Sequence, residues 1–329
     1  MGKTERMGSS VRAAFAAAAI TASMGLMAIS TPVATAQDAT PAAMAACVAP
    51  ELPPGTPTPM DMASPEAMPP MMEPMASPAA EVERVGNPAN EQVAAEATAA
   101  VENIVACLNS GNLEGTVALM TDNYIMSSFG TGNPYDVVGF LEGFSFQNFT
   151  TGAVYAYDDG SVSVDVQYNE SQYQVTGERW FFVQDGEYWK LDADESITPV
   201  VDGDTAVVGV SLTDYAFTFN VGSVVQPEVL MFQVRNDGTE PHEIVLFRMP
   251  EGAETADDVA AMLKDDPEGS FMSDDAFIGA TFAMPGEQSN LTLVGLEPGK
   301  YVAICFIPGP DGQPHYAHGM IGEFEVIGL

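Results

Sequence analysis

No aromatic residue occurs between Phe15 and Tyr124, and this gap limits where the chain can build a folded core. Residues 37–89 within it consist largely of Pro, Ala and Met, and 11 of the 24 prolines lie between Pro41 and Pro78. A segment without aromatic residues or hydrophobic periodicity buries too little surface to offset the entropy lost on ordering. We therefore predict that residues 37–89 form a disordered linker and that folded domains begin near residue 90.

Residues 1–36 have the features of a secretory signal peptide. A basic start containing Lys3 and Arg6 precedes an apolar run over residues 13–29, and the segment ends in Ala34-Thr35-Ala36, which matches an A-x-A cleavage site. We predict cleavage at this site, with a mature protein that is secreted or held in the periplasm or cell envelope. No later stretch is long and apolar enough to predict a membrane span.

The charge balance restricts the partners of the chain. It carries 46 Asp and Glu residues against 10 Lys and Arg residues, for a formal net charge of −36. Binding to nucleic acid requires clustered basic residues, so this balance excludes strong nucleic-acid binding and disfavours an anionic membrane surface. The chain has only 3 Cys and 3 His residues, which limits metal binding to one small site.

Residues 90–197 begin with a helical pattern. Apolar residues recur at helical spacing over residues 93–108, and Asn90 suits the N-cap position. Two shorter helices are predicted, one over residues 113–120 and one after Asn133-Pro134.

The rest of this region has the period-two alternation of strands. Apolar and polar residues alternate over residues 161–168, and a run over residues 173–191 turns at Asp185-Gly186, as a hairpin does. Helices followed by an antiparallel sheet predict an α+β fold.

The stretch from Glu178 to Asp192, ERWFFVQDGEYWKLD, resembles the closing hairpin of the NTF2-like (SnoaL-like) family. The resemblance implies a cone-shaped pocket that serves either catalysis or ligand binding. This region contains no His, and Asp122, Asp136 and Asp165 have no evident acid–base partner. We therefore expect a binding or structural module here rather than an enzyme.

Residues 198–329 are predicted to form an all-β sandwich, because short apolar runs alternate with Pro- and Gly-containing turns. An acidic helical insertion over residues 254–275 interrupts the strands. The expected strands cover Val207–Phe219, Glu228–Arg235, Glu243–Arg248, Phe277–Met284, Ser289–Val294, Lys300–Phe306 and Ile321–Ile327.

All three histidines of the chain lie in this C-terminal region. His242 precedes a predicted strand, Cys305 ends another, and the following loop holds His315, His318 and Met320. Two imidazoles, one thiolate and a weak thioether form the donor set that suits a copper ion cycling between Cu(I) and Cu(II).

Two segments carry a resemblance to the cupredoxin (blue, type 1 copper) family, and to its plastocyanin-like members in particular. They are the N-x-G…P-H segment at residues 236–242 and the L-x-P-G-x-Y-x-x-x-C segment at residues 296–305, and the spacing of His315 and Met320 also matches. The resemblance implies a Greek-key sandwich that binds one copper ion. By position, the implied ligands are His242, Cys305, His315 and Met320.

The segment between Cys305 and His315 is longer than this family usually has. Either it bulges outward and returns His315 to the site, or His318 is the ligand and His315 lies on the surface. A third alternative is a sandwich without metal, and a fourth is another metal such as zinc.

We therefore expect an exported protein with a mononuclear, type 1-like copper site that transfers single electrons or carries copper. It is not expected to be an enzyme, since protein ligands would close the site and three histidines are too few for a trinuclear copper cluster. The acidic insertion could attract a cationic redox partner such as a cytochrome, or could simply be a solvated helix. The alternative function is a metal-free cell-envelope module whose NTF2-like cone holds a small ligand or partner.

The remaining cysteines, Cys47 and Cys107, could form a disulfide between the linker and the first helix. That pairing would suit an oxidising compartment and leave Cys305 as the single thiol.

Overall fold

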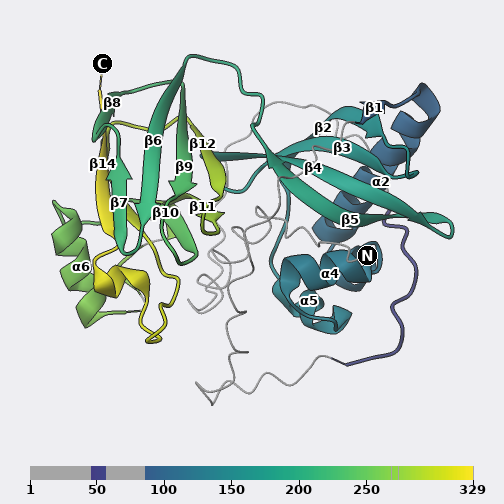
Figure 1. Cartoon of the computed structure of the whole chain (residues 1–329), viewed down its shortest axis with the longest axis horizontal. Coiled ribbons are helices and arrows are strands. Elements are labelled where there is room, and N and C mark those ends of the chain that lie inside the picture. Colours follow the sequence, from purple (N-terminus) through teal and green to yellow (C-terminus); the bar gives the residue numbers. More distant parts are fainter. Residues whose placement is uncertain (1–45, 57–85, 268, 273, 329) are drawn as a thin grey trace, which may run out of the picture.

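The computed structural model describes residues 46–56 and 86–328, except residues 268 and 273 (Figure 1). The predicted signal peptide, residues 1–36, lies outside the described residues, as does most of the predicted linker. Within the described part of the chain, no helix is both long and apolar enough to cross a membrane.

The N-terminal part, residues 86–197, contains the helices that the sequence predicts. The longest begins after Asn90, whose side-chain oxygen accepts a hydrogen bond from the backbone N–H of Val93 at 3.0 Å. A short helix that the sequence patterns did not indicate follows Thr121. The helices are α2 (Glu91–Asn109), α3 (Leu113–Ala118), α4 (Asp122–Phe129) and α5 (Pro134–Phe140).

The helices of the N-terminal part pack against an antiparallel sheet (Figure 1). The strands run in the order β1-β2-β3-β4, with β5 paired to the other side of β4. This arrangement agrees with the expected α+β class, whereas the NTF2-like resemblance stays a prediction. The strands are β1 (Asn87–Pro88), β2 (Gln147–Ala156), β3 (Val162–Asn169), β4 (Gln174–Asp185) and β5 (Tyr188–Ile197).

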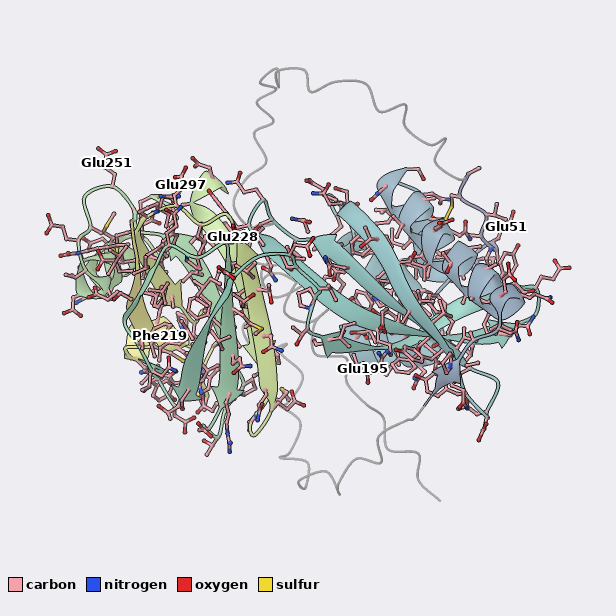
Figure 2. All side chains as sticks on the ribbon, turned by 90° about the horizontal axis from the view of Figure 1, so that it is seen from above. Glu51, Glu195, Phe219, Glu228, Glu251 and Glu297 are labelled. Atoms are coloured by element: carbon pink, nitrogen blue, oxygen red, sulfur yellow. A yellow bond between two sulfur atoms is a disulfide. The ribbon has the colours of Figure 1, made fainter. Side chains whose placement is uncertain are left out.

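The linker prediction is wrong for residues 46–56, which pack against the N-terminal part, and for residues 86–89, which contain strand β1 paired to β2. Cys47 forms a disulfide with Cys107 of α2, as the cysteine count suggested, and the sulfur–sulfur bond lies beside α2 in Figure 2. The backbone N–H of Val48 donates to Asn103 at 2.8 Å, and the hydroxyl of Tyr135 donates to the carbonyl of Pro53 at 2.8 Å. Covalent attachment and backbone hydrogen bonds order this stretch although it lacks aromatic residues.

The sandwich, residues 205–327, consists of two facing sheets, which confirms the all-β prediction for this region. One face has the order β12-β9-β6-β7, and the other has the order β11-β10-β13-β14-β8. Apolar side chains from both sheets, including Phe232 and Phe324, fill the space between them. The strands are β6 (Thr205–Thr213), β7 (Ala216–Phe219), β8 (Ser223–Val225), β9 (Val229–Asn236), β10 (His242–Arg248), β11 (Phe277–Ala283), β12 (Gln288–Val294), β13 (Gly299–Ile304) and β14 (Ile321–Ile327).

The predicted strand Val207–Phe219 is in fact two strands, β6 and β7, which pair with each other. The chain reverses at Asp214 and Tyr215, and Tyr215 has a left-handed backbone with φ of 66°. A turn that uses no Gly or Pro leaves no punctuation in the sequence, so the two strands looked like one.

The acidic insertion contains a helix, α6 (Ala256–Asp265), that covers the outer face of the sheet containing β10. Thr255 and Asp258 form a reciprocal capping box at its start. Val259 and Leu263 are buried against the sheet, so the acidic side chains of α6 face away from it.

The two parts share a continuous sheet, because the start of β4 pairs with β12 at Gln174↔Leu293 and Val175↔Thr292. Side chains reinforce the joint: Gln174 exchanges two hydrogen bonds with the backbone of Ala280, and the hydroxyl of Ser171 donates to Ile278 at 2.6 Å. The strand ladder therefore ties the N-terminal part to β12, and the side-chain hydrogen bonds tie it to β11.

Candidate metal centre

Three buried donor side chains meet at one end of the sandwich: His242, Cys305 and His315. Their ligand atoms all lie within 4.8 Å of one another, and each residue is fully buried. The two Nδ1 atoms of the histidines are 3.0 Å apart, and the sulfur of Cys305 is 3.4 Å from Nδ1 of His315. These residues are separated by up to 73 positions in the chain, so the fold is what assembles them.

Strand order explains this convergence. His242 begins β10, and Cys305 follows the end of β13, the antiparallel neighbour of β10, so both residues lie at the same end of the sheet. The next strand, β14, begins just after Met320. The backbone N–H of Cys305 donates to the carbonyl of Met320 at 3.3 Å, which places these two residues opposite each other. Met320 is fully buried in the core between the sheets.

The nine-residue segment between Cys305 and His315 forms a small hairpin of its own. Pro308 and Pro314 form an antiparallel bridge, and the N–H of Gly309 donates to Gln313 at 2.7 Å. The segment thus folds back on itself, and the N–H of His315 donates to the carbonyl of Ile307 at 2.8 Å. This geometry matches the first alternative for the long loop, in which the segment bulges outward and returns His315 to the site.

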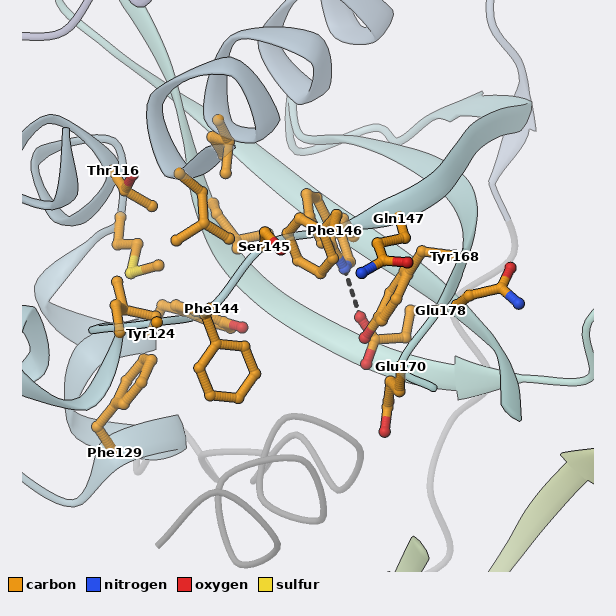
Figure 3. A pocket seen from close by; sticks show the side chains of 18 of the residues that line it. Thr116, Tyr124, Phe129, Phe144, Ser145, Phe146, Gln147, Tyr168, Glu170 and Glu178 are labelled. Atoms are coloured by element: carbon orange, nitrogen blue, oxygen red, sulfur yellow. Dashed lines mark hydrogen bonds between the residues drawn. The ribbon is translucent and has the colours of Figure 1, made fainter. Parts of the chain in front are cut away.

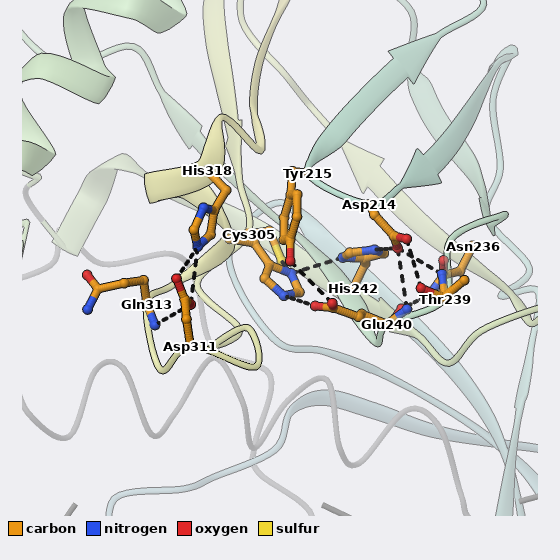
Figure 4. A network of polar contacts seen from close by, with 11 residues as sticks. Asp214, Tyr215, Asn236, Thr239, Glu240, His242, Cys305, Asp311, Gln313 and His318 are labelled. Carbon is orange, nitrogen blue, oxygen red and sulfur yellow. Dashed lines mark hydrogen bonds and ion pairs between the residues drawn. The ribbon is translucent and has the colours of Figure 1, made fainter. Parts of the chain in front are cut away.

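His318 lies apart from this group of donors. Its side chain is 33% exposed, and its Nε2 atom lies 3.1 Å from a carboxylate oxygen of Asp311 (Figure 4). Among the described residues, the group of converging metal donors contains His315 and not His318. The alternative that His318 is the ligand and His315 lies on the surface does not fit this arrangement.

Each histidine of the group also contacts a carboxylate through its outer nitrogen (Figure 4). Nε2 of His242 is 3.3 Å from Asp214, and Nε2 of His315 is 2.9 Å from Glu240. A carboxylate can only accept, so it favours the tautomer with the proton on Nε2. Both Nδ1 atoms are then free of protons and face each other, and that of His315 also faces the sulfur of Cys305, so both can serve as metal ligands.

The carboxylates are held in place by the loop between β9 and β10. Asp214 accepts hydrogen bonds from the backbone N–H and the hydroxyl of Thr239, both at 2.8 Å. Asn236 is fully buried and donates to the carbonyl of Glu240 at 2.8 Å. A side chain on Gly238 would collide with Asp214 and with the ring of His242, so the glycine is needed for this close approach.

Tyr215 covers the outer side of His315. Its ring packs edge-on against the His315 ring with centroids 5.2 Å apart, and it also contacts His318. The hydroxyl of Tyr215 donates to Glu240 at 3.2 Å. The tyrosine and the carboxylate together shield His315 from solvent.

Burial controls the protonation of the donors. Loss of solvation lowers the pKa of His242 and of His315, which keeps both imidazoles neutral. Burial also raises the pKa of Cys305 to about 12, with a further rise from the nearby charge of Glu243. Without a metal the thiol therefore keeps its proton, and a metal must displace that proton to bind.

The donor set fits a single transition-metal ion. Bonds of about 2.0 Å to nitrogen and 2.3 Å to sulfur, at angles near 110–120°, place donor atoms roughly 3.3–3.7 Å apart. Two of the observed spacings, 3.0 and 3.4 Å, lie close to this range, and the third pair of donor atoms lies within 4.8 Å. Two imidazoles and one thiolate, with a thioether-bearing residue beside them, suit copper, and hard ions such as Mg²⁺ and Ca²⁺ prefer oxygen donors.

Sequence analysis missed three residues that shape this centre: Asp214, Tyr215 and Glu240. Asp214 and Tyr215 lie in the turn between β6 and β7, where the sequence pattern predicts a single strand. Glu240 lies inside the N-x-G…P-H segment, and its acidic side chain two residues before His242 was the one signal that could have indicated a partner for a histidine.

No protein-family model matches the chain, and no curated protein matches it. Among solved structures, the chain is similar to reduced auracyanin from the photosynthetic bacterium Roseiflexus castenholzii, with 25% identity, 36% of this chain and 95% of that chain covered, and a TM-score of 0.27. It is also similar to auracyanin A, described as a "blue" copper protein from the green thermophilic photosynthetic bacterium Chloroflexus aurantiacus. That match has 20% identity and a TM-score of 0.27, and it covers 37% of this chain and 99% of the auracyanin chain. It is also similar to an azurin from Methylomonas sp. strain J, with 18% identity and a TM-score of 0.25; the match covers 38% of this chain and 97% of the azurin chain.

Proposed function

We propose that the chain binds one copper ion through His242, Cys305 and His315, with Met320 as a weak additional ligand, and that it transfers single electrons or carries copper. The observation that supports this proposal is the meeting of two Nδ1 atoms and one sulfur, 3.0 and 3.4 Å apart, in a fully buried spot. Copper supplies a one-electron couple when bound, and the resemblance to cupredoxins in residues 198–329 points to the same chemistry.

The residues around the donors suit electron transfer better than catalysis. His242 begins a strand, Cys305 follows the end of another, and His315 follows a hydrogen-bonded hairpin. This support would hold the donors in one geometry for both oxidation states. The carboxylates of Asp214 and Glu240 fix the orientation of the two rings. Because His242, Cys305 and His315 are fully buried, a substrate would have no direct access to these side chains.

The proposal includes export and a redox partner. The signal-peptide pattern of residues 1–36 and the Cys47–Cys107 disulfide are both consistent with an oxidising compartment outside the cytoplasm. The net charge of −36 and the outward acidic side chains of α6 would favour a cationic partner such as a cytochrome.

The test is the visible spectrum of the full chain after addition of Cu(II). We expect one copper per chain and an intense blue thiolate-to-copper absorption, and Cys305→Ser should abolish the colour while the chain stays folded. A colourless protein that binds no copper would overturn the proposal in favour of the metal-free alternative. Tight, colourless binding of zinc that copper cannot displace would point to the zinc alternative.

A further inference from the structure

A cavity of about 400 Å³ lies in the N-terminal part, between its helices and the sheet strands β3 and β4 (Figure 3). This volume is within the range of roughly 300–1,000 Å³ that small-molecule sites occupy. Phe277, the first residue of β11, also lines the cavity, so the sandwich contributes to its wall. The cavity is separate from the metal centre and shares none of its residues.

The cavity has an aromatic wall. Phe146 packs against Tyr168 with ring centroids 4.6 Å apart and against Trp180 with centroids 5.7 Å apart. Tyr124 and Phe129 extend the aromatic lining on the helical side. The faces of such rings carry partial negative charge and attract cations.

Two acidic side chains, Glu170 and Glu178, lie in the same lining (Figure 3). Glu178 is fully buried on β4 and accepts a hydrogen bond from Nε1 of Trp180 at 2.6 Å. Glu170 follows β3 and accepts a hydrogen bond from the hydroxyl of Thr176 at 2.9 Å. Among the described residues that line the cavity, none is Lys, Arg or His.

The charge of Glu178 shifts the pKa values of other titratable groups in the cavity lining. After burial, the charge of Glu178 is the next cause that raises the pKa of Tyr168, and it also contributes to the raised pKa of Glu170. The basic residue of this strand, Arg179, points to the opposite face of β4, where it pairs with Asp165 and Glu195. The cavity lining thus holds two acidic side chains and no basic one, in an apolar surrounding.

We propose that this cavity binds a small organic cation: an ammonium group placed against Glu178 and Glu170 and attached to an apolar body that packs against Phe146, Tyr168 and Trp180. An anionic ligand would be repelled by the two carboxyl groups. A neutral apolar ligand would desolvate these groups and give them no compensating charge. A cation can pair with the carboxylates and lie against the ring faces at the same time. Because the cavity is separate from the metal centre, this binding does not depend on copper.

The test compares three molecules of the same size that differ in charge: 2-phenylethylammonium, 2-phenylethanol and phenylacetate. Binding to the full chain is measured at pH 9, above the pKa of about 8 that burial gives Glu170, so that this carboxyl group is ionised. Calorimetry and tryptophan fluorescence report the binding, since Trp180 lies in the cavity wall. We expect the ammonium compound to bind about tenfold more tightly than the alcohol, and phenylacetate to bind most weakly.

The variants Glu178→Gln and Glu170→Gln should each reduce the preference for the ammonium compound over the alcohol, while Glu187→Gln, in the exposed turn between β4 and β5, should not. If Glu178→Gln does not fold, the Glu170→Gln variant decides the question.

Equal or tighter binding of the alcohol or of phenylacetate would overturn the proposal, and so would the absence of saturable binding. A cation preference that survives in both cavity variants would also overturn it, because the acidic outer surface would then be the binding site. Repeating the titration with and without Cu(II) separates this result from the fate of the copper proposal.

Discussion

The Nδ1 atoms of His242 and His315 face each other at 3.0 Å, while the Nε2 atom of each ring lies against its own carboxylate. If both carboxylates accept a proton from Nε2, two lone pairs oppose each other across this short gap. Such an arrangement is unfavourable unless a proton or a metal ion lies between the nitrogens. The protein therefore holds the two rings in an orientation that suits a cation between them.

The first prediction concerns which histidine completes the site. His315→Ala should abolish the blue absorption and weaken copper binding by more than the roughly 10- to 100-fold loss typical of an outer-shell change, because it removes a donor atom. His318→Ala should bind copper about as tightly as the wild type. Copper affinity is measured by competition with a chelator of known strength. Loss of the blue site in His318→Ala, with His315→Ala unaffected, would reverse the ligand assignment.

The carboxylate behind His242 gives a second prediction. Asp214→Asn removes the negative charge that favours the Nε2 proton of His242 and adds a competing amide donor, so copper affinity should fall by roughly 10- to 100-fold while the blue absorption is kept. The matched control is Asp311→Asn, since Asp311 contacts the Nε2 atom of His318, which lies outside the donor group. The two variants are compared by chelator competition and by the copper spectrum. Equal affinities for both variants would show that the Asp214 contact does not organise the site.

Part of this centre was visible in the sequence because its donors lie in short local motifs. Cys305, His315 and Met320 fall within 16 residues of each other, and the elements on either side have a clear strand pattern. Their carboxylate partners were not visible, since the contacts cross the fold. Asp214 is 28 positions from His242, and Glu240 is 75 positions from His315.

The fold shows the same division between local and long-range information. The helix α2 followed from its periodicity and its Asn90 cap. The strand β2 did not, because most of its residues are exposed and no apolar alternation marks it. The pairing of β4 with β12 involves Val175 and Thr292, and nothing in either local sequence specifies that partner. The contact of residues 46–56 with α2 similarly depends on a disulfide between positions 60 apart.

The disulfide is the basis of a third prediction. It closes a loop of 60 residues, and the chain-entropy model gives a stabilisation of about 4 kcal/mol for a loop of this length. A double variant, Cys47→Ser with Cys107→Ser, should have a free energy of unfolding lower by an amount of that order, and its denaturant midpoint should fall accordingly. Unfolding is followed by tryptophan fluorescence, since both tryptophans, Trp180 and Trp189, lie in the N-terminal part. Cys305→Ser is the control for loss of a thiol, and an unchanged midpoint in the double variant would contradict the prediction.

The last prediction concerns pH and Glu170. Burial, with a contribution from the charge of Glu178, raises the pKa of Glu170 from an ordinary value of 4.5 to about 8 in the folded chain. Between these two values the folded state holds a proton that the unfolded state has released, so this group makes the free energy of unfolding fall as pH rises. The slope is at most about 1.4 kcal/mol per pH unit for one proton.

Glu170→Gln cannot release a proton and resembles the protonated acid, so it should be as stable as the wild type near pH 4.5 and more stable near pH 8. The measurement is the midpoint of thermal unfolding of both proteins across this range, in metal-free buffer. The difference between the two proteins isolates Glu170 from every other titrating group, and Glu187→Gln, which alters an exposed carboxyl group, should track the wild type. A difference between Glu170→Gln and the wild type that stays constant with pH would mean that Glu170 is ionised in the folded protein at neutral pH.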